Sequence, residues 1–98
     1  MPSTPEGVVK ERIKRLFKKL GVWYCMPIGQ AYGRAGIPDF VCCVEGKFLA
    51  VEAKAGRRGP TALQFMEIDK ILAAGGKALV VRTSNLDELE ALIVEMKG

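Results

Sequence analysis

Three charged residues stand at a spacing that could bring them together around a metal ion. Asp39 and Glu52 supply carboxylates, and Lys54 supplies an ammonium group two residues beyond Glu52. The chain has no histidine, which excludes Ser-His-Asp and Cys-His nucleophiles and disfavours a zinc site. Any catalytic metal would therefore bind carboxylates and carbonyls, the oxygen ligands typical of Mg²⁺ and Mn²⁺.

The turn between the two acids sets their register. Glu45-Gly46 separates two apolar runs and predicts a two-residue hairpin turn. With that turn, Asp39 lies directly opposite Glu52, where Cβ atoms are about 4.5–5.5 Å apart. Glu52 and Lys54 project from one face because side chains alternate along a strand. We therefore expect the three side chains to converge on one spot.

A simpler interpretation is that Lys54 only pairs with the two acids at the end of a strand, since an isolated Glu-x-Lys is short and common. Pro38-Asp39, thirteen residues before Glu52, favours the functional interpretation. Both faces of the hairpin are largely apolar, so we expect a sheet covered on both sides. Three charges at the end of a buried hairpin are costly unless a metal or a substrate engages them.

Two further polar residues fall on helix faces that are otherwise apolar. Glu6 lies about 35° from the centre of the first helix's apolar stripe, which consists of Val9, Ile13, Leu16, Phe17 and Leu20. Its other role is to stabilise the helix dipole in the first turn, and Glu11, on the far side, is a second candidate acid. Gln64 faces inward and can also form a capping box with Thr61. We expect Glu6 and Gln64 to face the acids.

The remaining pattern predicts an α/β fold with one domain over residues 1–98. Helices are expected over 5–20, from 61 to the glycines at 75–76, and after 85, and strands over 22–26, 39–44, 47–54 and 77–82. The order α-β-β-β-α-β-α implies a mixed sheet flanked by helices. The apolar face expected for the second helix consists of Phe65, Ile68, Ile71 and Leu72. The last helix is expected to pack on the sheet through Leu86, Leu89, Leu92, Ile93 and Met96.

Two glycine-containing loops carry candidates for phosphate binding. Tyr32 and Arg34 lie in the first loop, and Arg57 and Arg58 follow Lys54 in the second. They could hold phosphates beside the acids, although solvated loop charges are an equally good interpretation of each residue singly. The lysine stripe of the first helix is expected to be an ordinary solvated face; it consists of Lys10, Lys14 and Lys18.

Composition limits the partners and the compartment. The 98 residues carry a formal charge of +4, which modestly favours a polyanionic partner. No apolar run is long enough for a membrane span, and the N-terminal residues lack the apolar core of a secretory signal. The three cysteines form no Cys-x-x-Cys pair. These features predict a cytoplasmic protein with reduced thiols.

The run from Gly33 to Gln64, GRAGIPDFVCCVEGKFLAVEAKAGRRGPTALQ, resembles the VRR-NUC branch of the PD-(D/E)xK nucleases. It has the Gly-x-Pro-Asp element at 36–39, the Glu-x-Lys element at 52–54 and a glutamine on the following helix. The resemblance extends from Glu6 to about Arg82. It implies the restriction-endonuclease-like core and a stand-alone nuclease of the kind found in phage and prophage genomes.

The resemblance also implies roles for individual residues. Asp39 and Glu52 would bind Mg²⁺ or Mn²⁺, with the Ala53 carbonyl as a further ligand, and Lys54 would orient or deprotonate the attacking water. Glu6 and Gln64 match the family's helix-one acid and helix glutamine. Stand-alone members look like Holliday-junction resolvases and tend to be homodimers, which implies cleavage of DNA at four-way junctions. Two alternatives stay open: a non-catalytic module that binds DNA structures, and a nuclease subunit that needs a partner such as a helicase.

Overall fold

The chain forms an α/β fold with a four-stranded mixed sheet and three α-helices in this computed structural model, which describes residues 4–28 and 35–98. The predicted order of the elements is confirmed, and the first strand is shorter than expected. The elements are α1 (Pro5–Leu20), β1 (Trp23–Cys25), β2 (Phe40–Val44), β3 (Lys47–Ala53), α2 (Ala62–Ala73), β4 (Lys77–Val81), the short 3₁₀ turn η1 (Thr83–Asn85) and α3 (Leu86–Lys97).

Local sequence explains where α1 begins and how the hairpin turns. The Thr4 hydroxyl accepts a hydrogen bond from the Gly7 N–H at 2.9 Å, so it satisfies one of the free amides at the start of α1. Between β2 and β3, Glu45 and Gly46 both have positive φ, 50° and 78°. Positive φ at both central residues defines the type I′ turn, whose twist matches that of paired strands. The two-residue turn inferred from the sequence is confirmed.

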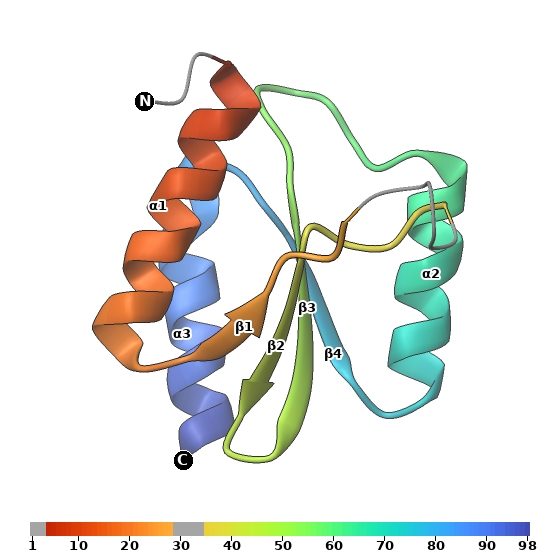
Figure 1. Ribbon diagram of the computed structural model, residues 1–98. Helices are drawn as coiled ribbons and strands as arrows, with labels where there is room; N and C mark the ends of the chain where they lie inside the picture. Colours follow the sequence, from red (N-terminus) through yellow and green to blue (C-terminus); the bar gives the residue numbers. More distant parts are fainter. Residues whose placement is uncertain (1–3, 29–34) are drawn as a thin grey trace.

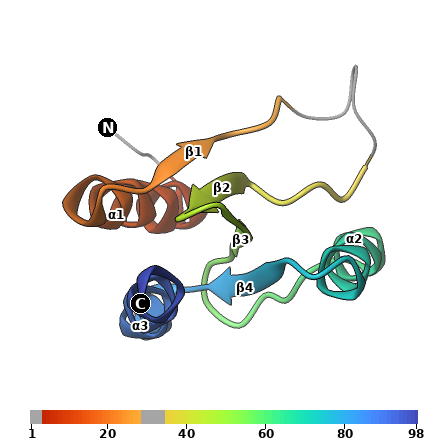
Figure 2. The ribbon, with the colours of Figure 1, turned by 90° about the horizontal axis from the view of Figure 1, so that it is seen from below.

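The strands lie in the order β1-β2-β3-β4, with antiparallel pairing from β1 to β3 and parallel pairing between β3 and β4. Phe40 pairs with Val51 and Val44 with Lys47, which is the register expected from the turn. The parallel pair requires a crossover connection, which α2 supplies. Figures 1 and 2 show α1 and α3 side by side on one face of the sheet and α2 on the other.

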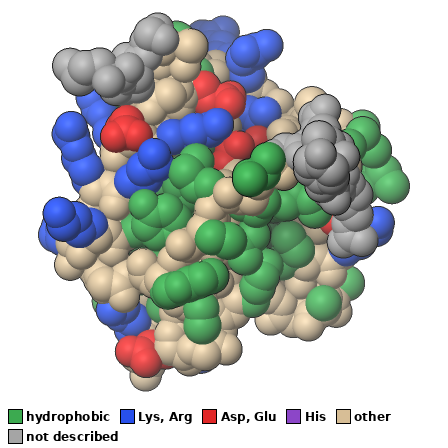
Figure 3. Space-filling view, viewed as in Figure 1, with side chains coloured by type: hydrophobic (Ala, Val, Ile, Leu, Met, Phe, Trp, Pro, Cys, Tyr) green, Lys and Arg blue, Asp and Glu red, His purple; other side chains and the backbone are tan. Residues whose placement is uncertain are grey.

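The face that carries α2 is only partly covered, so the expectation of a sheet covered on both sides is wrong. Trp23, Cys43 and Phe48 occupy one cross-strand row there, and Trp23 and Phe48 are 62% and 43% exposed. The reason is that α2 lies beside β4 and leaves β1 and β2 uncovered (Figure 2). Hydrophobic side chains gather across the middle of the surface in Figure 3, below a group of acidic and basic side chains.

The orientation of α2 also differs from the expected one. Ile68 and Ile71 are half-buried, but Phe65 and Leu72, predicted to face the core, are 51% and 49% exposed. A single helix against one strand buries only a narrow stripe of its surface, so the flanks of the predicted apolar face remain outside.

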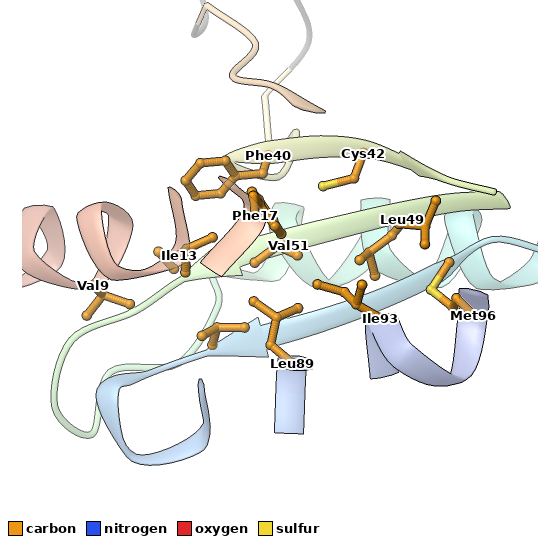
Figure 4. Close-up of a cluster of buried hydrophobic side chains, with 13 residues drawn as sticks. Val9, Ile13, Phe17, Phe40, Cys42, Leu49, Val51, Leu89, Ile93 and Met96 are labelled. Carbon is orange, nitrogen blue, oxygen red and sulfur yellow. The ribbon is translucent and has the colours of Figure 1, made fainter. Parts of the chain in front are cut away.

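The hydrophobic core lies between the sheet and the pair α1 and α3 (Figure 4). Its centre is aromatic: the Phe17 ring packs 5.0 Å from the Tyr24 ring and 5.5 Å from the Phe40 ring, measured between centroids. Leu89, Ile93 and Met96 of α3 are buried in it, so the expected packing of the last helix on the sheet is confirmed. This core fixes the sheet against α1, and both elements contribute to the site described below.

None of the described helices is long and apolar enough to cross a membrane. All three cysteines are free thiols; Cys25 and Cys43 are exposed, and burial raises the pKa of Cys42 to about 12.

Candidate active site

Asp39 and Glu52 face each other at the open end of the β2–β3 hairpin. The Asp39 N–H donates to Glu52 Oε1 at 3.2 Å, and the Ala53 N–H donates to Asp39 Oδ2 at 2.9 Å. Each carboxylate is therefore held by the backbone of the strand opposite its own. The convergence of the two acids, expected from the hairpin register, is confirmed by these contacts.

Glu52 is a buried acid, and its surroundings raise its pKa. Its side chain is only 2% exposed. Burial, and then the neighbouring charge of Asp39, raise the pKa of Glu52 to about 7, although the ammonium group of Lys54 acts in the opposite direction. Two carboxylates that cannot both ionise cheaply are a common feature of functional sites, because a bound cation relieves their repulsion.

Lys54 follows β3 directly and turns back to the acid pair. Its Nζ lies 3.3 Å from Glu52 Oε2, and its side chain is 12% exposed. The Lys54 N–H donates to the Val81 carbonyl at 3.0 Å, which fixes the backbone of the lysine to the end of β4. The ammonium group is thus positioned from two strands, beside a largely buried carboxylate.

Gln64 performs both of the roles considered for it. Its Oε1 accepts from the Thr61 N–H at 2.9 Å, and the Thr61 hydroxyl accepts from the Gln64 N–H at 3.2 Å, which completes a capping box. The side-chain nitrogen of Gln64, Nε2, donates to Glu52 Oε2 at 2.8 Å. The start of α2 therefore orients the buried acid.

Gly36 explains how the loop before Asp39 reaches α2. Its φ is +87°, and a Cβ atom there would lie 2.5 Å from the Leu63 carbonyl oxygen and 3.0 Å from the Gln64 nitrogen. No side chain fits so close to the backbone of the first helical turn. After Gly36 the chain continues through Ile37 and the buried Pro38 to Asp39. The glycine lets the loop and the helix that carry Asp39 and Gln64 meet.

Helix α1 contributes a cation that the sequence analysis assigned to solvent. The Lys10 ammonium group lies 3.5 Å from Asp39 Oδ1 and 3.8 Å from Glu6 Oε2, with 30% of its side chain exposed. The interpretation of Lys10 as part of a purely solvated face is therefore wrong. Glu6 lies on the site's side of α1, and among the described residues Lys10 is what joins it to the acid pair. Glu11 instead pairs with Lys14 at 3.0 Å.

The basic loops contribute less to the described geometry. Arg57 and Arg58 are exposed, and among residues 4–28 and 35–98 no ion pair joins them to the acids. The Arg82 guanidinium donates to the Arg58 carbonyl at 2.7 Å, so the loop is attached to the end of β4. Tyr32 and Arg34, the other two candidate phosphate contacts, lie outside the described residues.

The donor set fits a divalent cation of the Mg²⁺ or Mn²⁺ type. In the described part of the chain no three acidic or cysteine side chains form a ready cage. Mg²⁺, however, keeps several waters and commonly binds one or two carboxylates. The C=O of a strand residue points to the same side as its own N–H, so the Ala53 carbonyl is directed to the side where its N–H meets Asp39. Each carboxylate oxygen also has a second lone pair.

The chain matches no family model, and no curated protein matches its sequence. Function is therefore inferred from the geometry of the site. That geometry includes three residues that sequence reasoning did not assign to it: Lys10, Gly36 and Arg82. Two of them left a signal in the sequence. Lys10 stands four residues after Glu6 and so shares its side of the helix, and Gly36 opens the Gly-x-Pro-Asp element.

Proposed function

We propose that the protein is a metal-dependent endonuclease of the PD-(D/E)xK type, with the VRR-NUC branch as the family it resembles. The observation that carries the proposal is the joint placement of two carboxylates and one ammonium group. Asp39 lies opposite Glu52 in the hairpin, and Lys54 Nζ is 3.3 Å from Glu52. The reaction is hydrolysis of a phosphodiester bond in DNA.

Each residue has a role in this reaction that follows from its contacts. Asp39, Glu52 and the Ala53 carbonyl would hold Mg²⁺ or Mn²⁺, which supplies Lewis-acid polarisation of the phosphate and acidification of a bound water. Gln64 keeps the Glu52 carboxylate in one orientation through its 2.8 Å hydrogen bond. Lys54 donates to the attacking water or to the phosphate oxygens, where it offsets the negative charge that grows in the transition state.

Four-way junctions are the substrate to test first, as the resemblance implies, and paired nicks at a junction call for two sites related by a two-fold axis. The final helix is one surface that a second copy could use, but its Leu89, Ile93 and Met96 are buried in the core. Trp23 and Phe48 on the open sheet face are 62% and 43% exposed, so we propose that face for a second copy. Light scattering at micromolar concentration tests this point, and a strict monomer would end the homodimer proposal.

Cleavage assays on junction and duplex DNA with Mg²⁺ or Mn²⁺ test the catalytic proposal. We expect Asp39→Asn and Lys54→Ala each to lower the cleavage rate by at least about 10²-fold. Asp39→Asn is preferred to alanine because the amide oxygen still accepts from the Ala53 N–H. The matched control is Lys19→Ala, since Lys19 pairs with Glu90 at 3.5 Å, far along the chain from the site. Equal rates in all three variants and the wild type would refute the assignment.

One observation supports a second function, a non-catalytic module that binds DNA structures. Both oxygens of Asp39 and both of Glu52 already have protein partners, so the described acid pair is satisfied without an added cation. Such a module would bind junctions in EDTA, with an affinity that falls as salt is raised. Tight junction binding in EDTA, together with failure to cut in Mg²⁺ or Mn²⁺, would favour this function over the nuclease.

A further inference from the structure

Lys10 stands where two acids from different elements meet. Its ammonium group is 3.5 Å from Asp39 Oδ1, on the hairpin, and 3.8 Å from Glu6 Oε2, one turn earlier in α1. Asp39 Oδ2 accepts from the Ala53 N–H at 2.9 Å, whereas Oδ1 is the oxygen that the Lys10 ammonium group approaches.

In the described part of the chain, each acid of the pair has an ammonium group beside it. Lys10 accompanies Asp39, and Lys54 accompanies Glu52 at 3.3 Å. A divalent ion bound between the carboxylates would add two positive charges to this arrangement. An ammonium group that stayed at 3.5 Å from Asp39 would then repel the ion at short range. Binding of the ion is therefore coupled to where the Lys10 ammonium group goes.

Glu6 offers the place to which Lys10 can move. Its carboxylate is already within 3.8 Å of Lys10 Nζ, and its side chain is 36% exposed. Rotation within the flexible lysine side chain is enough to exchange one partner for the other, and α1 does not have to shift. The pair has the i, i+4 geometry with the acid first, which is the favourable order on a helix.

We propose that Lys10 is the resident counter-ion of the acid pair, held on Asp39 without metal and transferred to Glu6 when a divalent cation binds. Lys10 is thus a positioning residue that sets metal affinity. This inference rests on the proposed function, because it takes Asp39 as a metal ligand.

The test is the dissociation constant for Mn²⁺, measured by isothermal titration calorimetry without DNA. Lys10→Met removes the competing charge, so we expect Mn²⁺ to bind roughly fivefold more tightly, the change that a partly exposed ion pair is worth. Lys14→Met is the matched control, because Lys14 lies one turn further along α1 and pairs with Glu11 instead. It reports the effect of removing one positive charge at a distance. Lys10→Arg, which keeps the charge, should bind Mn²⁺ like the wild type.

Glu6→Gln separates the transfer from a simple charge effect. In the wild-type background it removes the second partner of Lys10, and we expect Mn²⁺ to bind about twofold to threefold more weakly. In the Lys10→Met background the same change should have no effect. Weakening in both backgrounds would mean that Glu6 is itself a ligand, which overturns the transfer.

The remaining outcomes separate this inference from the proposed function. If wild-type protein binds Mn²⁺ but Lys10→Met and Lys14→Met are indistinguishable, the role of Lys10 is refuted and the metal site stands. If no variant binds Mn²⁺, both are refuted. Far-ultraviolet circular dichroism of each variant verifies folding. If Lys10→Met does not fold, Lys10→Arg still tests the role of the charge, because it should leave the dissociation constant for Mn²⁺ unchanged.

Discussion

The titration of Glu52 offers a measurement of the acid pair that needs neither substrate nor metal. Burial and Asp39 raise its pKa from 4.5 to about 7. Between these values the folded protein keeps a proton that the unfolded chain has released, so stability falls as pH rises through this window. The stabilisation is complete below about pH 4.5 and is lost above pH 7. One pKa unit corresponds to about 1.4 kcal/mol, so the loss is on the order of 3 kcal/mol.

Glu52→Gln removes this titration while keeping the size of the side chain. Urea unfolding in EDTA, followed by circular dichroism at pH 5 and pH 8, gives the difference between the two proteins, in which all other titrating groups cancel. With a slope of about 1.5 kcal/mol per molar urea, the wild-type midpoint should fall by about 2 M more than that of the variant. Equal pH dependence in the two proteins would refute the assigned cause of the raised pKa.

Mn²⁺ should reverse this loss in the wild type, because a bound cation favours the ionised carboxylate. At pH 8 we expect Mn²⁺ to raise the wild-type urea midpoint and to leave that of Glu52→Gln almost unchanged. A rise of the same size in both proteins would place the ion away from Glu52.

Two further substitutions test the supports of the site. In Gly36→Ala, the new Cβ would meet the Leu63 carbonyl at 2.5 Å and φ is +87°; we expect a loss of about 1–3 kcal/mol in urea unfolding and slower cleavage. Gly59→Ala, with open space around it, should change stability by less than about 0.5 kcal/mol, and equal losses in the two would contradict the close approach. Phe17→Ala should lose about 3–5 kcal/mol, whereas Phe65→Ala, at a ring 51% exposed, should lose far less; similar losses would mean that Phe65 is buried in solution.

Local rules were sufficient for the part of the site that lies on the hairpin. The type I′ turn fixes the pairing of Phe40 with Val51, and this pairing alone brings Asp39 to Glu52. The capping box of α2 was likewise visible as a threonine and a glutamine three residues apart. In both cases the interactions that form the structure join residues that are close in sequence or are paired by the strand register.

The features that sequence reasoning missed depend on how whole elements are placed. The residues of β2 and β3 do not predict that α2 lies beside β4, and this placement leaves Phe48 exposed. Lys10 had the pattern of a solvated helix residue, and only the position of α1 over the end of the hairpin brings its ammonium group to Asp39. The close approach of Gly36 to Leu63 joins segments whose separation no local spacing encodes.

The hydrogen bonds that hold Asp39 and Glu52 have a structural consequence of their own. The two carboxylates accept hydrogen bonds from the Ala53 and Asp39 N–H groups at the point where β2 and β3 separate. They therefore provide the last hydrogen bonds between the two strands. The groups assigned to chemistry also prevent the strand ends from fraying. Closing the end of the hairpin therefore also brings the two acids together. For the same reason, Asp39→Ala would weaken the pairing of the strand ends as well as remove the proposed metal ligand.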